Sequence, residues 1–185
     1  MNLPLLKKWI TRWESTRFAA YDDKTGKPIT PTTVLVGKAH IGVGFDLEAP
    51  GAEAIVTGLH LDYAGIKAGR VIITADQVDE LLDATIAPAV IGARNLVPTL
   101  DTLPADKQMV LVDLTFNMGE HGLSKFVNTL QAVKDQKWTV AAAALQDSTW
   151  FHEVGSLPTQ RGGADVAVLA GTATTAGILA KKAKA

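Results

Sequence analysis

Apolar residues recur at helical intervals near the start of the chain and then give way to a polar segment. Within residues 2–19 the apolar positions that recur at roughly helical spacing are Leu5, Leu6, Trp9, Ile10, Trp13 and Phe18. This spacing is typical of an amphipathic helix, so residues 2–19 are predicted to be helical. The segment 21–33 is rich in turn formers, and Pro28 and Pro31 exclude a helix there.

Residues 34–47 follow a different pattern, in which apolar and polar positions alternate. One set of alternate positions, called here the apolar parity, comprises Leu35, Ala39, Ile41, Val43 and Phe45. The opposite parity comprises Lys38, His40, Gly42, Gly44 and Asp46. A period of two predicts a half-buried strand or hairpin with one polar face. Asp23 and His40 are therefore expected to flank a small sheet, with His40 on its polar side.

Helical periodicity dominates from residue 51 onward. Thr74 and Gln77 have the spacing of a capping box at the start of a long helix, which Pro88 is expected to kink or to end early. A later helix is predicted to begin at Pro104 and to stop at Gly119. Further helices, joined by short polar turns, are predicted after it.

This order of elements predicts one domain of the α+β class with two lobes. A small mixed lobe is expected at approximately residues 18–70, and a connecting helix over residues 74–93. Residues 95–180 are expected to form a larger helical lobe that packs with the N-terminal helix. Two lobes joined by a long helix would leave a cleft between them.

Composition narrows the classes of function. The 185 residues are 47% hydrophobic and 20% charged, which suffices for a folded core. A formal net charge of −1 argues against a dedicated nucleic-acid binder but does not exclude an anionic polymer as substrate. There is no cysteine, the histidines lack metal-binding spacing, and no phosphate-binding glycine motif occurs. No metal or cofactor is therefore expected.

Both ends of the chain bear on where it is expected to act. No apolar segment typical of a signal peptide occurs near the N-terminus, so a cleaved signal peptide is not expected. The lack of cysteine fits folding in a reducing cytoplasm. Residues 166–180 carry no charge but are too short to span a bilayer, which favours a terminal core helix or a helix with a tail. The alternative is a weak membrane contact within residues 166–185, supported by the lysines Lys181, Lys182 and Lys184.

Two carboxyl groups near the N-terminus stand in contrasting surroundings. Glu14 lies beside Trp13 and four residues before Phe18, an apolar setting that favours the protonated form. Asp23 lies in a polar turn, where it should stay ionised. The alternative is that both are solvated surface charges. One protonated and one ionised carboxyl are what acid–base cleavage of a glycosidic bond requires.

Three motifs follow one another in a fixed order along residues 9–161. The first is RWESTRFAAYDDKTG, with Glu14 and Asp23, followed by HIGVGFDL. The others lie within LTFNMGEHGLSKFVNTLQAVKDQKWTVAAAALQDSTWF and end at Arg161. Their matching positions are Phe116, Met118, Gly119, Glu120, Gly122, Asn128, Leu130, Trp138, Ser148, Trp150 and Phe151. In this order and spacing the chain resembles the phage-type lysozymes, the endolysins of T-even phages.

The resemblance implies a lysozyme-like fold and muramidase activity. The bond cleaved would be the β-1,4 link between N-acetylmuramic acid and N-acetylglucosamine in bacterial peptidoglycan. Glu14 would be the proton donor, Asp23 would act on the opposite face of the sugar, and Arg161 would orient Glu14 by ion pairing. These roles are what the resemblance implies for these positions.

The resemblance also implies positions that contact the substrate. They are Asp46, Phe116, Asn117 and Thr129. Ala144 aligns with an asparagine of the family, so one contact is altered. A monomer that binds peptidoglycan is expected.

His40 is the main departure from the family pattern, because it aligns with the catalytic threonine and follows a longer loop. Imidazole could act as a base near neutral pH or attack the anomeric carbon itself. We hypothesise that the presence of His40 shifts the reaction from single-displacement inversion towards retention, with transglycosylation as a further outcome. The alternative is that the longer loop misaligns the segment, so that Thr32 or Thr33 fills the threonine's role and His40 is an ordinary polar residue.

The expected setting is host lysis by a phage or prophage endolysin, which would collect in the host cytoplasm before reaching the periplasm and wall. A virion-associated or secreted lysin would use the same chemistry, and a lytic transglycosylase would cleave the same bond. Two alternatives come from other classes: an inactive peptidoglycan-binding or structural module, and lysis by a membrane-active C-terminal segment.

Overall fold

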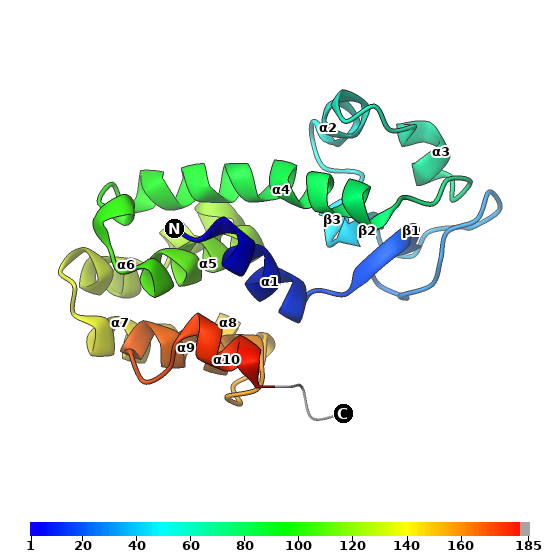
Figure 1. Ribbon diagram of the computed structural model, residues 1–185. Helices are drawn as coiled ribbons and strands as arrows, with labels where there is room; N and C mark the ends of the chain where they lie inside the picture. Colours follow the sequence, from blue (N-terminus) through cyan, green and yellow to red (C-terminus); the bar gives the residue numbers. More distant parts are fainter. Residues whose placement is uncertain (182–185) are drawn as a thin grey trace. The chain divides into compact units, whose positions relative to one another are not determined.

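The chain folds into two compact units, each described here by its own elements. The computed structural model describes residues 1–181. The sheet unit comprises residues 14–86, and the helical unit comprises residues 1–13 with the described residues from 87 onward. A three-stranded antiparallel sheet accompanied by helices confirms the predicted α+β class (Figure 1).

The sheet unit is built on three antiparallel strands in the order β1-β2-β3. They are β1 (Thr16–Asp22), β2 (Ala39–Val43) and β3 (Phe45–Asp46). The apolar parity predicted from alternation is buried at Ala39, Ile41, Val43 and Phe45. Strand β2 is shorter than the alternating segment, because Val34 and Val36 belong to the preceding loop and are exposed.

The predicted N-terminal helix is too long. Helix α1 spans Leu3–Trp13, and the residues from Thr16 belong to β1. Phe18 follows Trp13 by five residues, which breaks the helical period, and it lies on β1 with 46% of its surface exposed. Both ends of β1 pair with β2, and the Phe18 carbonyl between them accepts the Ile73 N–H at 2.9 Å, so these backbone partners override the apparent helical spacing.

Helices complete the sheet unit. They are α2 (Ala52–Gly58), α3 (Tyr63–Lys67) and the first half of α4 (Ala75–Leu96). The predicted capping box is present, because the Thr74 N–H donates to Gln77 Oε1 at 2.8 Å and the Gln77 N–H donates to Thr74 Oγ1 at 3.3 Å. The helix continues through Pro88 to Leu96, so the prediction of an early end there is wrong.

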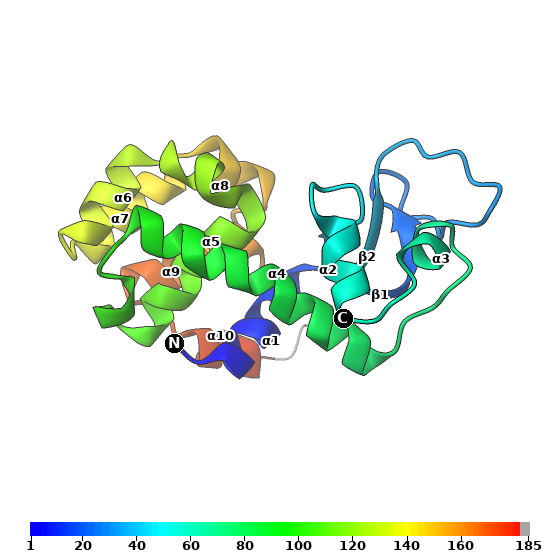
Figure 2. The ribbon, with the colours of Figure 1, turned by 90° about the horizontal axis from the view of Figure 1, so that it is seen from above.

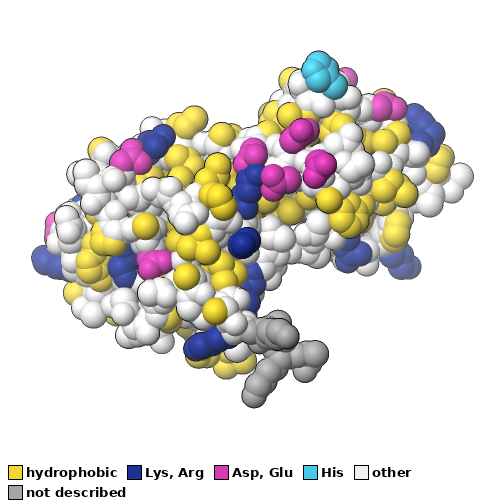
Figure 3. All heavy atoms as spheres, viewed as in Figure 1, with side chains coloured by type: hydrophobic (Ala, Val, Ile, Leu, Met, Phe, Trp, Pro, Cys, Tyr) yellow, Lys and Arg dark blue, Asp and Glu magenta, His cyan; other side chains and the backbone are white. Residues whose placement is uncertain are grey.

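Packing explains why α4 tolerates its proline. The helix buries an apolar stripe on both sides of Pro88, consisting of Val78, Leu81, Leu82, Ile86, Ala89 and Ala93. Its first half exposes acidic residues on the opposite face, which gather over α4 in Figure 3: Asp76, Asp79, Glu80 and Asp83. Burial of the stripe outweighs the single helical hydrogen bond that a proline removes.

The helical unit packs α1 against segments from distant parts of the chain. After the second half of α4 its elements are η1 (Leu100–Thr102), α5 (Ala105–Ser124), α6 (Val127–Lys134), α7 (Trp138–Gln146), α8 (Thr149–Glu153), α9 (Arg161–Ala170) and α10 (Thr175–Ala180). Helix α1 packs against α5 and α10, and α7 packs against α6 and α9 (Figure 2). Leu6, Trp9, Leu111, Leu114 and Val168 are fully buried there.

Two features of the helical unit follow from single residues. Gly119 has a φ of 72° and breaks α5 where the sequence predicted its end, because a left-handed residue cannot continue the helix. Residues 166–180 form the end of α9 and all of α10. The buried Lys107 ammonium donates to the Val168 carbonyl and, at 2.9 Å, to the Leu169 carbonyl, which satisfies the last turn of α9.

Membrane contact was an alternative for the C-terminal segment. Within residues 1–181, none of the helices has both the length and the apolar character needed to cross a bilayer. Lys182 and Lys184, named in the membrane-contact alternative, lie outside the described residues.

The capping box gives a stability prediction. Thr74→Ala removes the acceptor for the Gln77 N–H and should lower the free energy of unfolding by about 1 kcal/mol, measured by urea denaturation. Thr57→Ala is the matched control, because its hydroxyl donates to the Glu53 carbonyl inside α2 and caps no helix end. Equal effects of the two substitutions would show that the box does not stabilise α4.

Candidate active site

The sheet unit brings together four of the residues predicted to act on substrate. Glu14 follows α1, Asp23 directly follows β1, His40 lies on β2 and Asp46 lies on β3. The strand register pairs Tyr21 with His40, and His40 with Asp46. Neighbouring positions on paired strands lie within about 5.5 Å, so the sheet itself sets Tyr21, His40 and Asp46 side by side.

The Asp23 carboxylate is held by the start of β2. Its Oδ1 accepts the Lys38 N–H at 2.7 Å, while the Asp23 N–H donates to the Lys38 carbonyl at 3.0 Å. The side chain stays 42% exposed. A carboxylate fixed by one backbone donor and open to solvent on its other side is suited to act on a water molecule or on a developing positive charge.

The His40 ring lies between Asp23 and the backbone of its own strand. Its Nδ1 is 4.0 Å from Asp23 Oδ2 and 3.4 Å from the Lys38 carbonyl oxygen, and its side chain is 16% exposed. Both neighbours are acceptors, which favours the proton on Nδ1 in the neutral ring. The lone pair is then on Nε2, the atom that a base or nucleophile would use.

The threonine alternative for His40 is not favoured by the geometry. Thr33 Oγ1 accepts the Thr30 N–H at 2.8 Å, and Thr32 and Thr33 lie with Thr30 in an exposed turn of the loop. The β-sheet register instead places His40 opposite Tyr21, next to Asp23. Of the three candidates, the structure thus shows His40 beside Asp23, and its alignment with the family's threonine stays a prediction.

Tyr21 was not predicted from the sequence, although it lies on the same face of the chain as Asp23, two residues away. Its ring centroid is 5.9 Å from that of His40. Burial raises the pKa of the Tyr21 hydroxyl, and the negative charges of Glu14 and Asp23 raise it further. A hydrogen bond with Ser15 and the charge of Arg17 act in the opposite direction. The phenol is thus a neutral donor within the electric field of both carboxylates.

Glu14 lies over the turn between β2 and β3. A Cβ atom placed on Gly44 would be 3.5 Å from Glu14 Oε2, and Gly44 has a φ of 71°. The apolar surroundings predicted for Glu14 depended partly on Phe18 lying one helical turn away. That part of the prediction is wrong, because Phe18 lies on β1.

Asp46 is ionised and paired. Burial raises its pKa, but hydrogen bonds from the Lys38 ammonium at 2.8 Å and from the Glu48 N–H at 2.8 Å, together with the charges of Lys38 and His40, lower it below its usual value. Its side chain is mostly buried at the edge of β3. An oriented carboxylate of this kind can accept a hydrogen bond from a sugar hydroxyl.

The helical unit holds the predicted Arg161 in a buried acidic setting. Its guanidinium forms a bidentate pair with Asp113, with Nε–Oδ2 at 2.9 Å and Nη2–Oδ1 at 2.8 Å. Asp165 is fully buried beside them and accepts the Trp9 indole N–H at 3.2 Å. Burial raises the pKa of Asp165, and the charge of Asp113 raises it further. The role of Arg161 in orienting Glu14 stays a prediction, since the two residues belong to different units.

Phe116 and Asn117 lie near the end of the first part of α5. Phe116 is half-buried, and Asn117 is exposed. The Asn117 side-chain oxygen accepts the indole N–H of the buried Trp150 at 2.7 Å. This bond fixes which end of the amide is presented to solvent.

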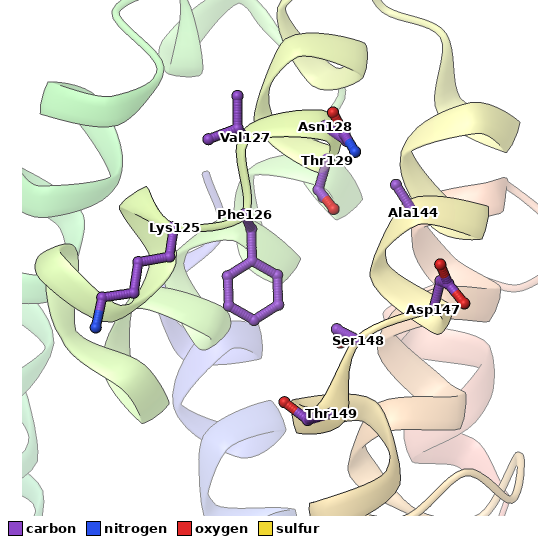
Figure 4. A pocket seen from close by; sticks show the side chains of 9 residues that line it. All are labelled: Lys125, Phe126, Val127, Asn128, Thr129, Ala144, Asp147, Ser148 and Thr149. Carbon is purple, nitrogen blue, oxygen red and sulfur yellow. The ribbon is translucent and has the colours of Figure 1, made fainter.

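Thr129 lines a pocket of about 320 Å³ between the start of α6 and the junction of α7 with α8 (Figure 4). Ala144 lines the same pocket from α7. Lys125, Phe126, Asn128, Asp147 and Ser148 contribute further side chains. The two positions for which the resemblance implies sugar contacts therefore line one pocket, and their contact with substrate stays a prediction.

A metal-dependent mechanism has no evident ligand set in the described part of the chain. Among residues 1–181 no cluster of three or more His, Asp or Glu side chains could hold a metal ion.

The chain is similar to known proteins over most of its length. A family model for phage lysozyme matches residues 11–162, which include every site residue named above from Glu14 to Arg161. Two curated proteins from Dictyostelium discoideum are similar to parts of the chain. Probable T4-type lysozyme 2 is 28% identical over 81 residues, 42% of this chain and 48% of that protein. Probable T4-type lysozyme 1 is 27% identical over 86 residues, which are 44% of this chain and 50% of that protein. The chain thus spans about half the length of the curated relatives it matches.

The buried pair of Asp113 with Arg161 gives a second stability prediction. Asp113→Ala removes a bidentate partner of a buried guanidinium and should lower the free energy of unfolding by about 3 kcal/mol, measured by chemical denaturation. Asp101→Ala is the matched control, because Asp101 forms the same bidentate pair with Arg94 on the surface, where solvent weakens it. A small effect at Asp113, equal to that at Asp101, would contradict the account of the buried pair.

Proposed function

Because the chain belongs to the phage lysozyme family, we propose that it is a glycoside hydrolase that cleaves bacterial peptidoglycan. The bond is the β-1,4 link between N-acetylmuramic acid and N-acetylglucosamine. The observation that carries the proposal is that the sheet unit holds both carboxyl groups at its strand ends. Glu14 lies against Gly44 at the turn between β2 and β3, and Asp23 is bonded to Lys38 at the start of β2 with His40 Nδ1 4.0 Å away.

The two carboxyls take opposite roles in this proposal. Glu14 donates a proton to the oxygen of the glycosidic bond as the bond breaks. Asp23, open to solvent and fixed by the Lys38 N–H, acts on the opposite face of the sugar. Arg161 is the residue proposed to orient Glu14, and within the helical unit its guanidinium is held by Asp113.

Substrate binding is assigned to polar and aromatic groups near these carboxyls and in the helical unit. Asp46 accepts a sugar hydroxyl, and Phe116 supplies an apolar surface for a sugar face. Asn117, whose amide is oriented by Trp150, and Thr129, in its pocket, contact further parts of the glycan. Peptidoglycan is the partner in this proposal, and the monomer is the acting species.

In this proposal His40 determines whether the configuration at the anomeric carbon is retained. With the proton on Nδ1, the Nε2 lone pair can activate a water molecule or attack the anomeric carbon. Attack by His40 would form a covalent glycosyl–imidazole intermediate, and a second displacement by water would then retain the configuration. Retention through a histidine would not require the short carboxyl separation of about 5–5.5 Å that a carboxylate nucleophile needs.

The biological setting in this proposal is host lysis by an endolysin. The enzyme collects in the host cytoplasm and reaches the wall by a separate route. The chemistry would be the same in a virion-associated or secreted lysin.

The role of Glu14 is tested by clearing of outer-membrane-permeabilised bacteria. Glu14→Gln keeps the size of the side chain but removes the proton donor, so the clearing rate should fall at least about a hundredfold. Glu53→Gln changes an exposed carboxylate on α2 in the same unit and should clear at the wild-type rate. Wild-type clearing by Glu14→Gln would exclude Glu14 as the acid and would point to lysis by the C-terminal segment, whereas an inactive wall-binding module predicts no clearing by the wild type either.

The role of His40 is tested by NMR of the first product formed. The wild type should release the β-anomer, whereas His40→Thr should release the α-anomer by direct attack of water. His60→Asn, at an exposed position with a φ of 58° that asparagine tolerates, serves as the control. An inverted product from the wild type would refute a nucleophilic His40.

A further inference from the structure

Two consecutive acidic residues end β1 and point to opposite sides of the chain. Asp22 is 2% exposed and Asp23 is 42% exposed. Alternation along a strand explains the opposite directions. The proposed mechanism uses Asp23 only, so the buried Asp22 has no role in it so far.

Figure 2 shows the long loop between β1 and β2. Asp22 accepts hydrogen bonds from both ends of this loop. Its Oδ1 accepts the N–H groups of Lys24 at 3.0 Å and Thr25 at 2.9 Å. Its Oδ2 accepts those of Val36 at 2.6 Å and Gly37 at 3.1 Å. One carboxylate therefore joins the first residues of the loop to its last residues.

The charge on Asp22 is strongly favoured. Burial raises the pKa of the carboxyl, but the hydrogen bonds from Val36, Gly37 and Thr25 outweigh burial and lower the pKa to about 2. Asp22 is thus ionised at any pH at which the enzyme would act.

The same stretch of backbone holds Asp23. The Val36 and Gly37 N–H groups bind Asp22, and the next N–H along the chain, from Lys38, binds Asp23. Gly37 also leaves room for the Asp23 carboxylate, because a Cβ at Gly37 would lie 2.0 Å from Asp23 Oδ1 and 2.8 Å from Lys24 Cβ. Any displacement of residues 36–38 would therefore move the group that orients Asp23.

We propose that Asp22 is a positioning residue for Asp23, which it serves by holding residues 36–38 against the end of β1. This inference rests on the proposed function, in which Asp23 acts on the sugar. Asp22 touches no reacting atom. Its effect passes through the Lys38 N–H and through the space that Gly37 leaves, so it should alter turnover more than binding.

The test compares kcat and KM on purified peptidoglycan. Asp22→Asn keeps one acceptor oxygen but replaces the other by an NH₂ group, which cannot accept from backbone donors. A misplaced catalytic group costs on the order of ten- to a hundredfold in rate, so kcat should fall by at least about tenfold with KM within about twofold. Asp62→Asn is the matched control, because Asp62 accepts the Gly65 N–H at the start of α3 in the same unit.

A second readout separates positioning from simple loss of stability. Hydrogen exchange of the Lys38 amide, followed by NMR, should speed up at least about tenfold in Asp22→Asn and not in Asp62→Asn. A folded Asp22→Asn with wild-type kcat, or with unchanged exchange at Lys38, would overturn the proposal.

Gly37→Ala covers the case in which Asp22→Asn does not fold. The added methyl group would displace the Asp23 carboxylate, so kcat should fall while KM holds. Gly58→Ala is its control, because a Cβ there meets nothing within 4 Å. A folded Gly37→Ala with full turnover would likewise overturn the proposal.

Asp23→Asn distinguishes this inference from the proposed function. If Asp23→Asn keeps wild-type turnover, the proposed function fails. If Asp23→Asn is inactive while Asp22→Asn and Gly37→Ala keep wild-type kcat, only the positioning role fails.

Discussion

The pairing of β1 with β2 is the constraint on which the candidate site depends. It sets Tyr21 opposite His40 and Asp22 opposite Ala39, and it leaves Asp23 bonded to Lys38 just beyond the last pair. A shift of one residue would turn every side chain of β2 to the other face. The buried Ile41 and Val43 oppose such a shift, because it would exchange them with the polar parity that carries His40. Burial of the sheet's apolar face thus fixes the position of the chemical groups.

The carboxyl groups of the sheet unit differ in burial and in hydrogen-bond partners. Asp22 is buried and saturated with backbone donors, whereas Asp23 receives one donor and remains open to solvent. Asp46 is paired with Lys38. Only a carboxylate with accessible oxygen atoms can act on a substrate. The surroundings of Asp22 therefore give it a structural role, whereas those of Asp23 leave it free for a chemical role.

The sequence predicted the parts of the site that depend on local order. Alternation in residues 34–47 identified the buried parity of β2 and the polar position of His40, and the capping box identified the start of α4. Local spacing failed where a distant partner decides the structure. Helical spacing predicts a helix at Phe18, but this residue lies in β1, whose two ends pair with β2 and whose Phe18 carbonyl accepts the Ile73 N–H. The apolar stripe of α4 continues that helix past Pro88.

Residues that act through distant contacts could not be predicted at all. Asp113 lies among apolar residues, and its role depends on its ion pair with Arg161, which follows it by 48 residues. The role of Asp22 depends on the N–H groups of Val36 and Gly37, which follow it by 14 and 15 residues. The sequence does not specify the course of the loop between them. Tyr21 had one available signal, its shared parity with Asp23 along an extended segment.

Mass spectrometry of digested peptidoglycan tests the central claim most directly, since it identifies the bond that is broken. The wild type should release fragments that end in reducing N-acetylmuramic acid, and Asp23→Asn should release almost none under the same conditions. Fragments that end in reducing N-acetylglucosamine or in anhydro-muramic acid, or an unchanged yield from Asp23→Asn, would contradict the account.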